Sequence, residues 1–217
     1  MKKVLTAFSL LISSSAMATG FYAGGQLGAS SVTFNNIYSM YNSTPAPHYD
    51  KKNTSSAAKG IICGIYGGYR YDFNNFFVAS ELDYNANTAS IESTHYYTKI
   101  KSVQNPSLAA HVLVGLPVGN NSEIYGRIGY TETVFKSEPK GLNEVPAASQ
   151  KLEGIILGLG TQHHFTDQLS IRLDYKYTKY QEVTTVISTD TNSSSYKDKF
   201  SIKPESHALT IGAQYTF

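Results

Sequence analysis

Apolar and polar residues alternate with a period of two in eight segments of the sequence. In LSIRLDYKYT (169–178), Leu, Ile and Tyr occupy the odd positions, whereas Ser, Arg, Asp, Lys and Thr occupy the even positions. Successive side chains of a β-strand point to opposite faces, so this pattern predicts a strand with one apolar and one polar face. The predicted strands cover residues 20–32, 60–71, 76–87, 107–117, 123–135, 151–165, 169–179 and 209–217.

The connections between these strands alternate in length. Three are short and rich in Asn, Asp and Gly, which favour chain reversal: 72–75, 118–122 and 166–168. Four are long and polar, and we predict them as loops: Thr33–Lys59, Thr88–Pro106, Lys136–Gln150 and Gln181–Lys203. Short turns at one end and long loops at the other are typical of bacterial outer-membrane barrels.

The membrane environment also requires the sheet to close on itself. Every backbone N–H and C=O must be paired internally in lipid, so an open sheet edge is excluded and the last strand must pair with the first. The sequence therefore predicts an all-β fold, an eight-stranded antiparallel transmembrane β-barrel with short periplasmic turns and long extracellular loops. The 17 Tyr and 10 Phe residues favour strands as well.

The first eighteen residues differ from the rest. They combine a basic start, an apolar run from Val4 to Ile12 and the small-x-small sequence Ala16-Met17-Ala18, which predicts a cleaved signal peptide (1–18) before a single barrel domain (19–217). Without Lys2 and Lys3, 16 of the 18 basic residues remain and balance the 16 acidic ones, so bulk charge gives no support for a nucleic-acid partner. The single cysteine allows no internal disulfide.

Five segments carry a family resemblance: GFYAGGQLGAS, GGYRYDFNNFFVASELDYN, SEIYGRIGYT, LSIRLDYKYT and IGAQYTF. With them the chain resembles the OmpA-type transmembrane domain and the opacity-type, porin-like surface proteins of Gram-negative bacteria. The resemblance implies an integral outer-membrane protein surrounded by outer-membrane lipid and lipopolysaccharide. It also implies that Tyr215 and Phe217 form the signal read by the outer-membrane assembly machinery. The chain has no Trp, so Tyr and Phe must supply any aromatic girdle.

Charged residues collect on the inward faces of the predicted strands. They are Arg70, Glu81, Asp83, Arg127, Arg172, Asp174 and Lys176, joined by His111. Buried charges must be paired or hydrated, so this lumen charge network is either a salt-bridged plug or a gated pore. Related barrels pair a lumenal Glu with an Arg, and the resemblance makes Glu81 with Arg172 the preferred pair.

Catalysis and metal binding find little support in the sequence. A lipid-modifying enzyme needs a nucleophile, a base and an orienting acid close together. The histidines are dispersed, and the adjacent His163 and His164 fall on opposite faces of one strand. Cys63 falls on the lipid face, and no loop has calcium-ligand spacing. We therefore expect no enzyme activity, no metal and no cofactor.

The long connections are dotted with tyrosines, of which Tyr41, Tyr49, Tyr96, Tyr97 and Tyr196 are candidate contact residues. They form either a solvated cap or a surface that binds a host or matrix ligand. The segment KYQEVTTVIST could extend a strand beyond the membrane and offer an edge for β-augmentation. The predicted function is a non-enzymatic integral surface protein that contributes to envelope integrity, with adhesion or host interaction through the extracellular loops as a possible further role. The alternatives are a narrow porin-like channel and a lipid-modifying enzyme.

Overall fold

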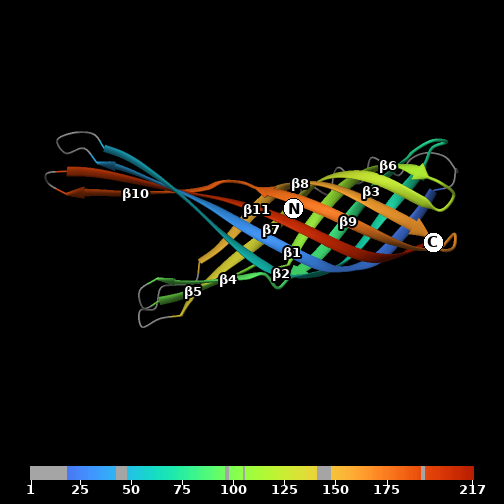
Figure 1. Ribbon diagram of the computed structural model, residues 1–217, viewed down its shortest axis with the longest axis horizontal. Coiled ribbons are helices and arrows are strands. Elements are labelled where there is room, and N and C mark those ends of the chain that lie inside the picture. Colours follow the sequence, from blue (N-terminus) through green and yellow to red (C-terminus); the bar gives the residue numbers. More distant parts are fainter. Residues whose placement is uncertain (1–18, 43–47, 96–97, 105, 141–147, 192–193) are drawn as a thin grey trace.

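In a computed structural model the described residues are 19–217, apart from 43–47, 96–97, 105, 141–147 and 192–193. The predicted signal peptide lies outside them. The described chain forms one antiparallel sheet of eleven strands (Figure 1). The strands are β1 Thr19–Asn42, β2 His48–Asp72, β3 Phe77–Asn87, β4 Ser90–His95, β5 Thr98–Gln104, β6 Ser107–Val118, β7 Ser122–Lys140, β8 Ala148–His164, β9 Leu169–Tyr180, β10 Val183–Thr191 and β11 Ser194–Thr216. No helix in the described part of the chain is long and apolar enough to cross a membrane.

Eight of these strands close into a barrel in the order β1-β2-β3-β6-β7-β8-β9-β11, with β11 paired back to β1. The β1–β11 pairing runs from Tyr22 opposite Thr216 to Asn42 opposite Tyr196. At its start the N–H of Phe217 donates to the carbonyl of Phe21 at 2.9 Å. The predicted eight-stranded antiparallel barrel is therefore confirmed.

The predicted alternation of faces is confirmed as well. Exposed apolar residues such as Leu27, Ile65 and Ile211 form the outer belt, whereas the inward positions of the same strands are buried and mostly polar. The turns are short, and Gly119 between β6 and β7 has a φ of 71°, in the left-handed region that favours glycine. An apolar outer belt around a polar interior is the arrangement that a bilayer requires of a barrel.

The prediction of four long loops was wrong in extent. At the end opposite the short turns, β1, β2, β7, β8 and β11 continue past the barrel, and β4, β5 and β10 form there. These segments are polar, but their backbones pair with one another as strands. The parts of the predicted loops at 43–47, 96–97, 105, 141–147 and 192–193 lie outside the described residues.

The extensions make two four-stranded sheets that diverge from the mouth of the barrel (Figure 1). The first sheet has the order β2-β1-β11-β10 and the second has the order β4-β5-β7-β8. The two sheets separate where β9 ends. This strand lies between β8 and β11, and its last residue paired with β8 is Tyr180. Each sheet therefore has two edge strands of its own, although the barrel below has none.

Candidate functional site: an ion-pair ring in the lumen

Four charged side chains form a closed ring across the middle of the lumen. Arg172 Nη1 lies 2.5 Å from Glu81 Oε2, and Arg127 Nη1 lies 3.1 Å from Glu81 Oε1. Asp174 completes the ring, 2.5 Å from Arg127 Nη2 and 3.0 Å from Arg172 Nε. Acids and bases alternate around the ring, so its formal charge is zero, and all four side chains are almost completely excluded from solvent. The ring comes from β3, β7 and β9, which the barrel brings together from distant parts of the sequence.

Tyrosine hydroxyls and rings surround the four charges. Tyr22 donates to Glu81 Oε2 at 3.1 Å, and Tyr125 donates to Asp174 Oδ1 at 2.7 Å. The guanidinium of Arg172 stacks on Tyr66, 3.3 Å from the ring centroid. Buried carboxylates with several charge-assisted donors are stable only as a complete network, so the tyrosines are part of the ring's support.

Inward glycines make room for these large side chains. A Cβ on Gly160 would lie 2.4 Å from the Tyr125 ring, and one on Gly24 would lie 2.3 Å from the Tyr66 ring. Such close approach leaves no space for any other residue without displacing the tyrosine. An apolar cluster of Tyr22, Tyr66, Phe77, Ala79, Leu113 and Tyr125 fills the adjacent lumen.

A second ion cluster lies next to the ring on its extracellular side. Lys176 Nζ is 2.7 Å from Asp83 Oδ2, and His111 Nε2 is 3.2 Å from the same oxygen. Gln26 accepts from Lys176 at 3.1 Å and donates to Asn85 at 2.6 Å. An enclosed cavity of about 40 Å³ adjoins Asp83 and Lys176. Among the described residues, Asp83 Oδ1 has no hydrogen-bond partner.

Arg70 does not join either cluster. It lies at the periplasmic end of the lumen, where its guanidinium contacts Asp72 at 2.5 Å and Glu123 at 2.6 Å. Glu123 also lies 3.3 Å from His164 Nε2. Glu123 is not among the lumenal charges predicted from the sequence, although it shares the parity of Tyr125 and Arg127 on β7 and could have been found by that signal.

Three of the five candidate contact tyrosines lie within the described residues. Tyr41, Tyr49 and Tyr196 lie in β1, β2 and β11 rather than in loops, and Tyr96 and Tyr97 lie outside the described residues. In the backbone register Tyr41 is opposite Tyr49, and the next residue, Asn42, is opposite Tyr196. The three positions are therefore neighbours at the far end of the first sheet.

The histidines do not gather into one site. His111 lies in the lumen, His164 near the periplasmic end and His207 on the outer surface, while His48 and His95 lie in β2 and β4. His163 Nδ1 is 2.9 Å from Ser122 Oγ, but no carboxylate contacts this pair among the described residues. Within the same residues, no group of three His, Cys, Asp or Glu side chains could hold a metal ion.

A closed barrel with an apolar outer belt and a packed, charged lumen defines an integral β-barrel protein of the bacterial outer membrane. The chain belongs to the outer membrane protein beta-barrel domain family, which matches residues 4–217. The family resemblance, the fold and the outer-membrane location predicted from the sequence are thereby confirmed. No curated protein sequence gives a significant match.

Three solved structures illustrate the similarity. Neisserial surface protein A has 15% identity and a TM-score of 0.50, with 93% of this chain and 100% of that chain covered. The outer membrane protease OmpT from Escherichia coli has 12% identity and a TM-score of 0.54, with 94% and 100% covered. Ail, the attachment invasion locus protein of Yersinia pestis, has 12% identity and a TM-score of 0.45, with 88% and 99% covered. At these identities the likeness shows the fold alone, and since a protease shares it, the fold does not separate enzymes from non-enzymes.

Proposed function

We propose that this protein is a non-enzymatic surface protein that supports envelope integrity and binds a host or matrix ligand through the first of its two extracellular sheets. The observation that carries the proposal is the contrast between the two halves of the molecule. The lumen is filled by the ion-pair ring and its tyrosines, whereas five barrel strands continue into ordered sheets outside. Binding residues are commonly displayed in this way on a rigid scaffold.

The far end of the first sheet supports a contact role. Tyr41, Tyr49 and Tyr196 occupy neighbouring positions on three adjacent strands. Tyrosine combines a large apolar ring with a hydroxyl and loses little conformational entropy on binding, so it is enriched at interfaces.

The edges of the sheets support recognition of an extended segment. β10 pairs with β11 alone among the described strands, so one side of its backbone is unpaired. Its sequence VTTVISTDT is rich in β-branched residues and has Asp190 as its only charge. By contrast, the outer part of β2 carries Asp50, Lys51 and Lys52, and charged residues protect edges from pairing. The edge of β10 is therefore the best placed to accept a strand from a ligand.

Trimming the first sheet tests the proposal. Bacteria that express the chain without residues 35–56 and 189–199 should lose binding to matrix-coated surfaces but keep the resistance to detergent that the full chain restores to a deletion strain. Removal of residues 90–104 from the second sheet is the matched control. Unchanged binding after trimming the first sheet would contradict the adhesive role, and detergent sensitivity unaffected by deletion would contradict the envelope role.

A gated channel is the second candidate function. The cavity of about 40 Å³ beside Asp83 supports it, because a void next to an unpartnered carboxylate oxygen is a place where water can enter. Planar bilayers with wild-type protein and with Glu81→Ala and Arg172→Ala test this function. Discrete conductance that rises in the variants supports the channel, whereas bilayers that stay silent in all three cases exclude it.

The non-enzymatic part of the proposal has a separate test. The Ser122–His163 pair combines a candidate nucleophile with a candidate base, but among the described residues no carboxylate contacts the histidine. Lipid A profiles from bacteria with and without the gene should be identical by mass spectrometry. A mass shift that depends on Ser122 would overturn the assignment.

A further inference from the structure

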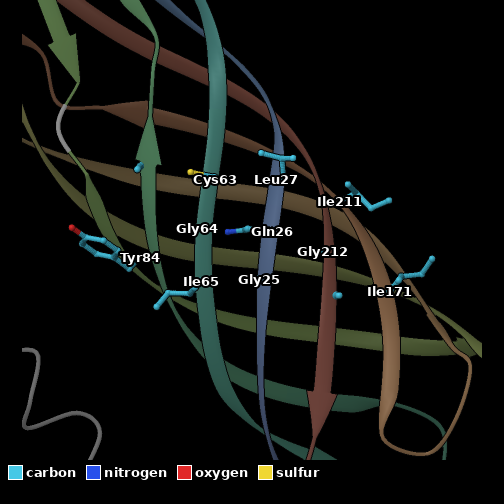
Figure 2. Close-up of a pocket in the computed structure, with 12 residues that line it drawn as sticks. Gly25, Gln26, Leu27, Cys63, Gly64, Ile65, Tyr84, Ile171, Ile211 and Gly212 are labelled. Atoms are coloured by element: carbon cyan, nitrogen blue, oxygen red, sulfur yellow. The ribbon is translucent and has the colours of Figure 1, made fainter.

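A broad groove of about 730 Å³ lies on the lipid-facing surface around β1 (Figure 2). One row of paired residues crosses it, with Gly25 and Ala213 at the centre and Ile65 and Ile171 on either side. Tyr84 extends the row on β3. The row above it runs from Cys63 through Leu27 to Ile211. Because two of the smallest side chains are flanked by branched ones, the surface is hollow along β1.

In the membrane this groove must be filled by acyl chains or by protein. A dry void would forfeit the dispersion contacts of its lining, and water is absent at this depth. The groove crosses five strands, a width of about 19 Å at a strand spacing of about 4.8 Å. A lipid with several acyl chains fits that width better than a lipid with two.

A polar row crosses the same strands at the extracellular end of the groove. Ser31 on β1 is flanked by Lys59 on β2 and His207 on β11, and His207 is opposite Tyr177 on β9. Ser31 is six residues from Gly25, about 20 Å along a strand. A strand tilted by about 40° rises about 15 Å over that length, which is half of the hydrocarbon thickness. Because Gly25 is the central residue of the exposed outward belt of β1, which runs from Phe21 to Ala29, the row lies where lipid head groups begin.

The residues of this row are arranged to receive an anion. Lys59 is exposed, and no ion pair is formed by it among the described residues. The His207 ring packs 5.1 Å from the Tyr177 ring, and its Nδ1 is hydrogen-bonded to the Tyr175 hydroxyl at 2.7 Å, which leaves Nε2 for a head group. The nearest carboxylate in the described register, Glu205, is opposite Lys179 in the backbone register and is hydrogen-bonded to the Tyr177 side chain.

A second groove, of about 550 Å³, provides an internal comparison on the other side of the barrel. It is lined by residues of β6, β7, β8 and β9, including Val112, Gly126 and Leu157. Glu132 and Glu153 are paired with each other beyond its extracellular end. Lys151 is bound to Glu132 at 2.7 Å, and this hydrogen bond raises the pKa of Lys151. Lys179, opposite Ile155, is a second lysine at this end, so two carboxylates face two lysines and the formal charge is zero. The difference from the β1 groove is that Lys151 is already ion-paired, which makes it a weaker phosphate ligand than Lys59.

We propose that the β1 groove is a binding site for lipid A, the phosphorylated, multiply acylated glycolipid of the outer leaflet. Its acyl chains lie over Gly25, Leu27 and Ala213, and a phosphate contacts Lys59, with Ser31 and His207 as further donors. Juxtamembrane cations bind anionic head groups in this manner. The site is separate from the lumen and from the extracellular sheets.

Native mass spectrometry of the detergent-solubilised protein mixed with purified lipid A tests the site. Wild-type protein should retain one lipid A, and the apparent Kd should rise about tenfold in Lys59→Glu because a charge-assisted contact is lost. Gly25→Leu should weaken binding by filling the groove, and Gly25→Ala should do so less. A Cβ at Gly25 has only a contact of 3.8 Å to the Gly64 carbonyl, so these variants should fold.

Lys151→Glu and Gly126→Leu are the matched controls in the second groove, where a Cβ on Gly126 meets nothing within 4 Å. Both should bind lipid A as wild type does. Dephosphorylated lipid A should bind wild-type protein weakly and be insensitive to Lys59→Glu. Equal binding by wild type and Lys59→Glu, equal losses in the controls, or phosphatidylglycerol held as tightly with the same dependence on Lys59 would each overturn the assignment. The heat-dependent shift on a denaturing gel confirms that each variant is folded.

Discussion

At the scale of single residues, Glu81 is the central hydrogen-bond acceptor of the lumen, because Arg127, Arg172 and Tyr22 all donate hydrogen bonds to its carboxylate. Its neighbours reach it only because glycines on facing strands leave room for Tyr66, Tyr125 and the arginines. The ion pairs therefore depend on the space that the glycines leave, and a larger residue at one of these glycines should displace the side chains of the ring.

Loss of the charge on Glu81 should be strongly destabilising. In Glu81→Gln two buried guanidinium groups lose their shared carboxylate, and removal of one partner of a buried ion pair costs about 3–5 kcal/mol. Urea unfolding in phospholipid vesicles measures the change. Lys151→Ala, which removes an exposed pair, should leave the midpoint unchanged. A Glu81→Gln midpoint equal to that of wild type would show that the ring does not hold the barrel together.

Gly160→Ala should also destabilise the barrel, by about 1–3 kcal/mol, as expected for overpacking. The added methyl would lie 2.4 Å from the Tyr125 ring and would push its hydroxyl away from Asp174. Gly126→Ala is the control on the outer surface, since nothing lies within 4 Å of its Cβ. The same unfolding assay compares the two variants, and equal stabilities would argue against the close packing of Tyr125.

At the scale of elements, the strands continue well beyond the lipid. Inside the bilayer the chain must alternate apolar and polar residues, but outside it a strand needs only backbone partners and suitable propensities. The result is two sheets with free edges above a barrel without any. Of these edges, β10 is long and nearly uncharged, whereas β4 has only six residues.

A charge on β10 should reduce association through that edge. Wild-type protein in detergent should form dimers at high concentration, and Ile187→Lys should shift the equilibrium to monomer because a lysine on an edge strand opposes pairing. Replacement of Lys51 and Lys52 by Thr on the β2 edge should have the opposite effect. Light scattering after size-exclusion chromatography measures both, and identical masses for all variants would exclude edge pairing.

The boundary between the membrane-spanning and extracellular parts of the strands also explains how much of the structure could be predicted from the sequence. Alternation predicted the barrel strands because lipid imposes it, but it stopped at Val32, where β1 in fact continues to Asn42. Parity also placed Glu81 and Arg172 inside the lumen. It could not show that Arg70 lies apart from them with Glu123, because the height of a side chain depends on strand tilt and register rather than on parity.

At the scale of the whole molecule, the barrel depends on pairing between its first and last strands. β1 and β11 pair from Tyr22 with Thr216 to Asn42 with Tyr196, so the seam runs through the membrane and on into the first sheet. The end of β11 also carries Tyr215 and Phe217, whose rings lie 5.2 Å apart on the outer surface.

Deletion of Phe217 should impair assembly in the cell without preventing the barrel from folding in vitro. If Tyr215 and Phe217 are read by the assembly machinery, the deleted chain should reach the outer membrane at a several-fold lower level. It should still refold in vesicles with the usual gel shift, since only one backbone bond, from Phe217 to Phe21, is lost. Immunoblots of membrane fractions measure the level. Normal levels in the cell would contradict the signal, and failed refolding in vitro would assign Phe217 a structural role instead.

The seam also determines when the first sheet can exist. Its two middle strands, β1 and β11, are the first and last strands of the barrel, and β11 is the strand with which β10 pairs among the described residues. A chain without β11 would therefore lack both the strand that closes the barrel and the strand that holds β10. The edge of β10 can thus be presented outside the membrane only by a barrel that has closed.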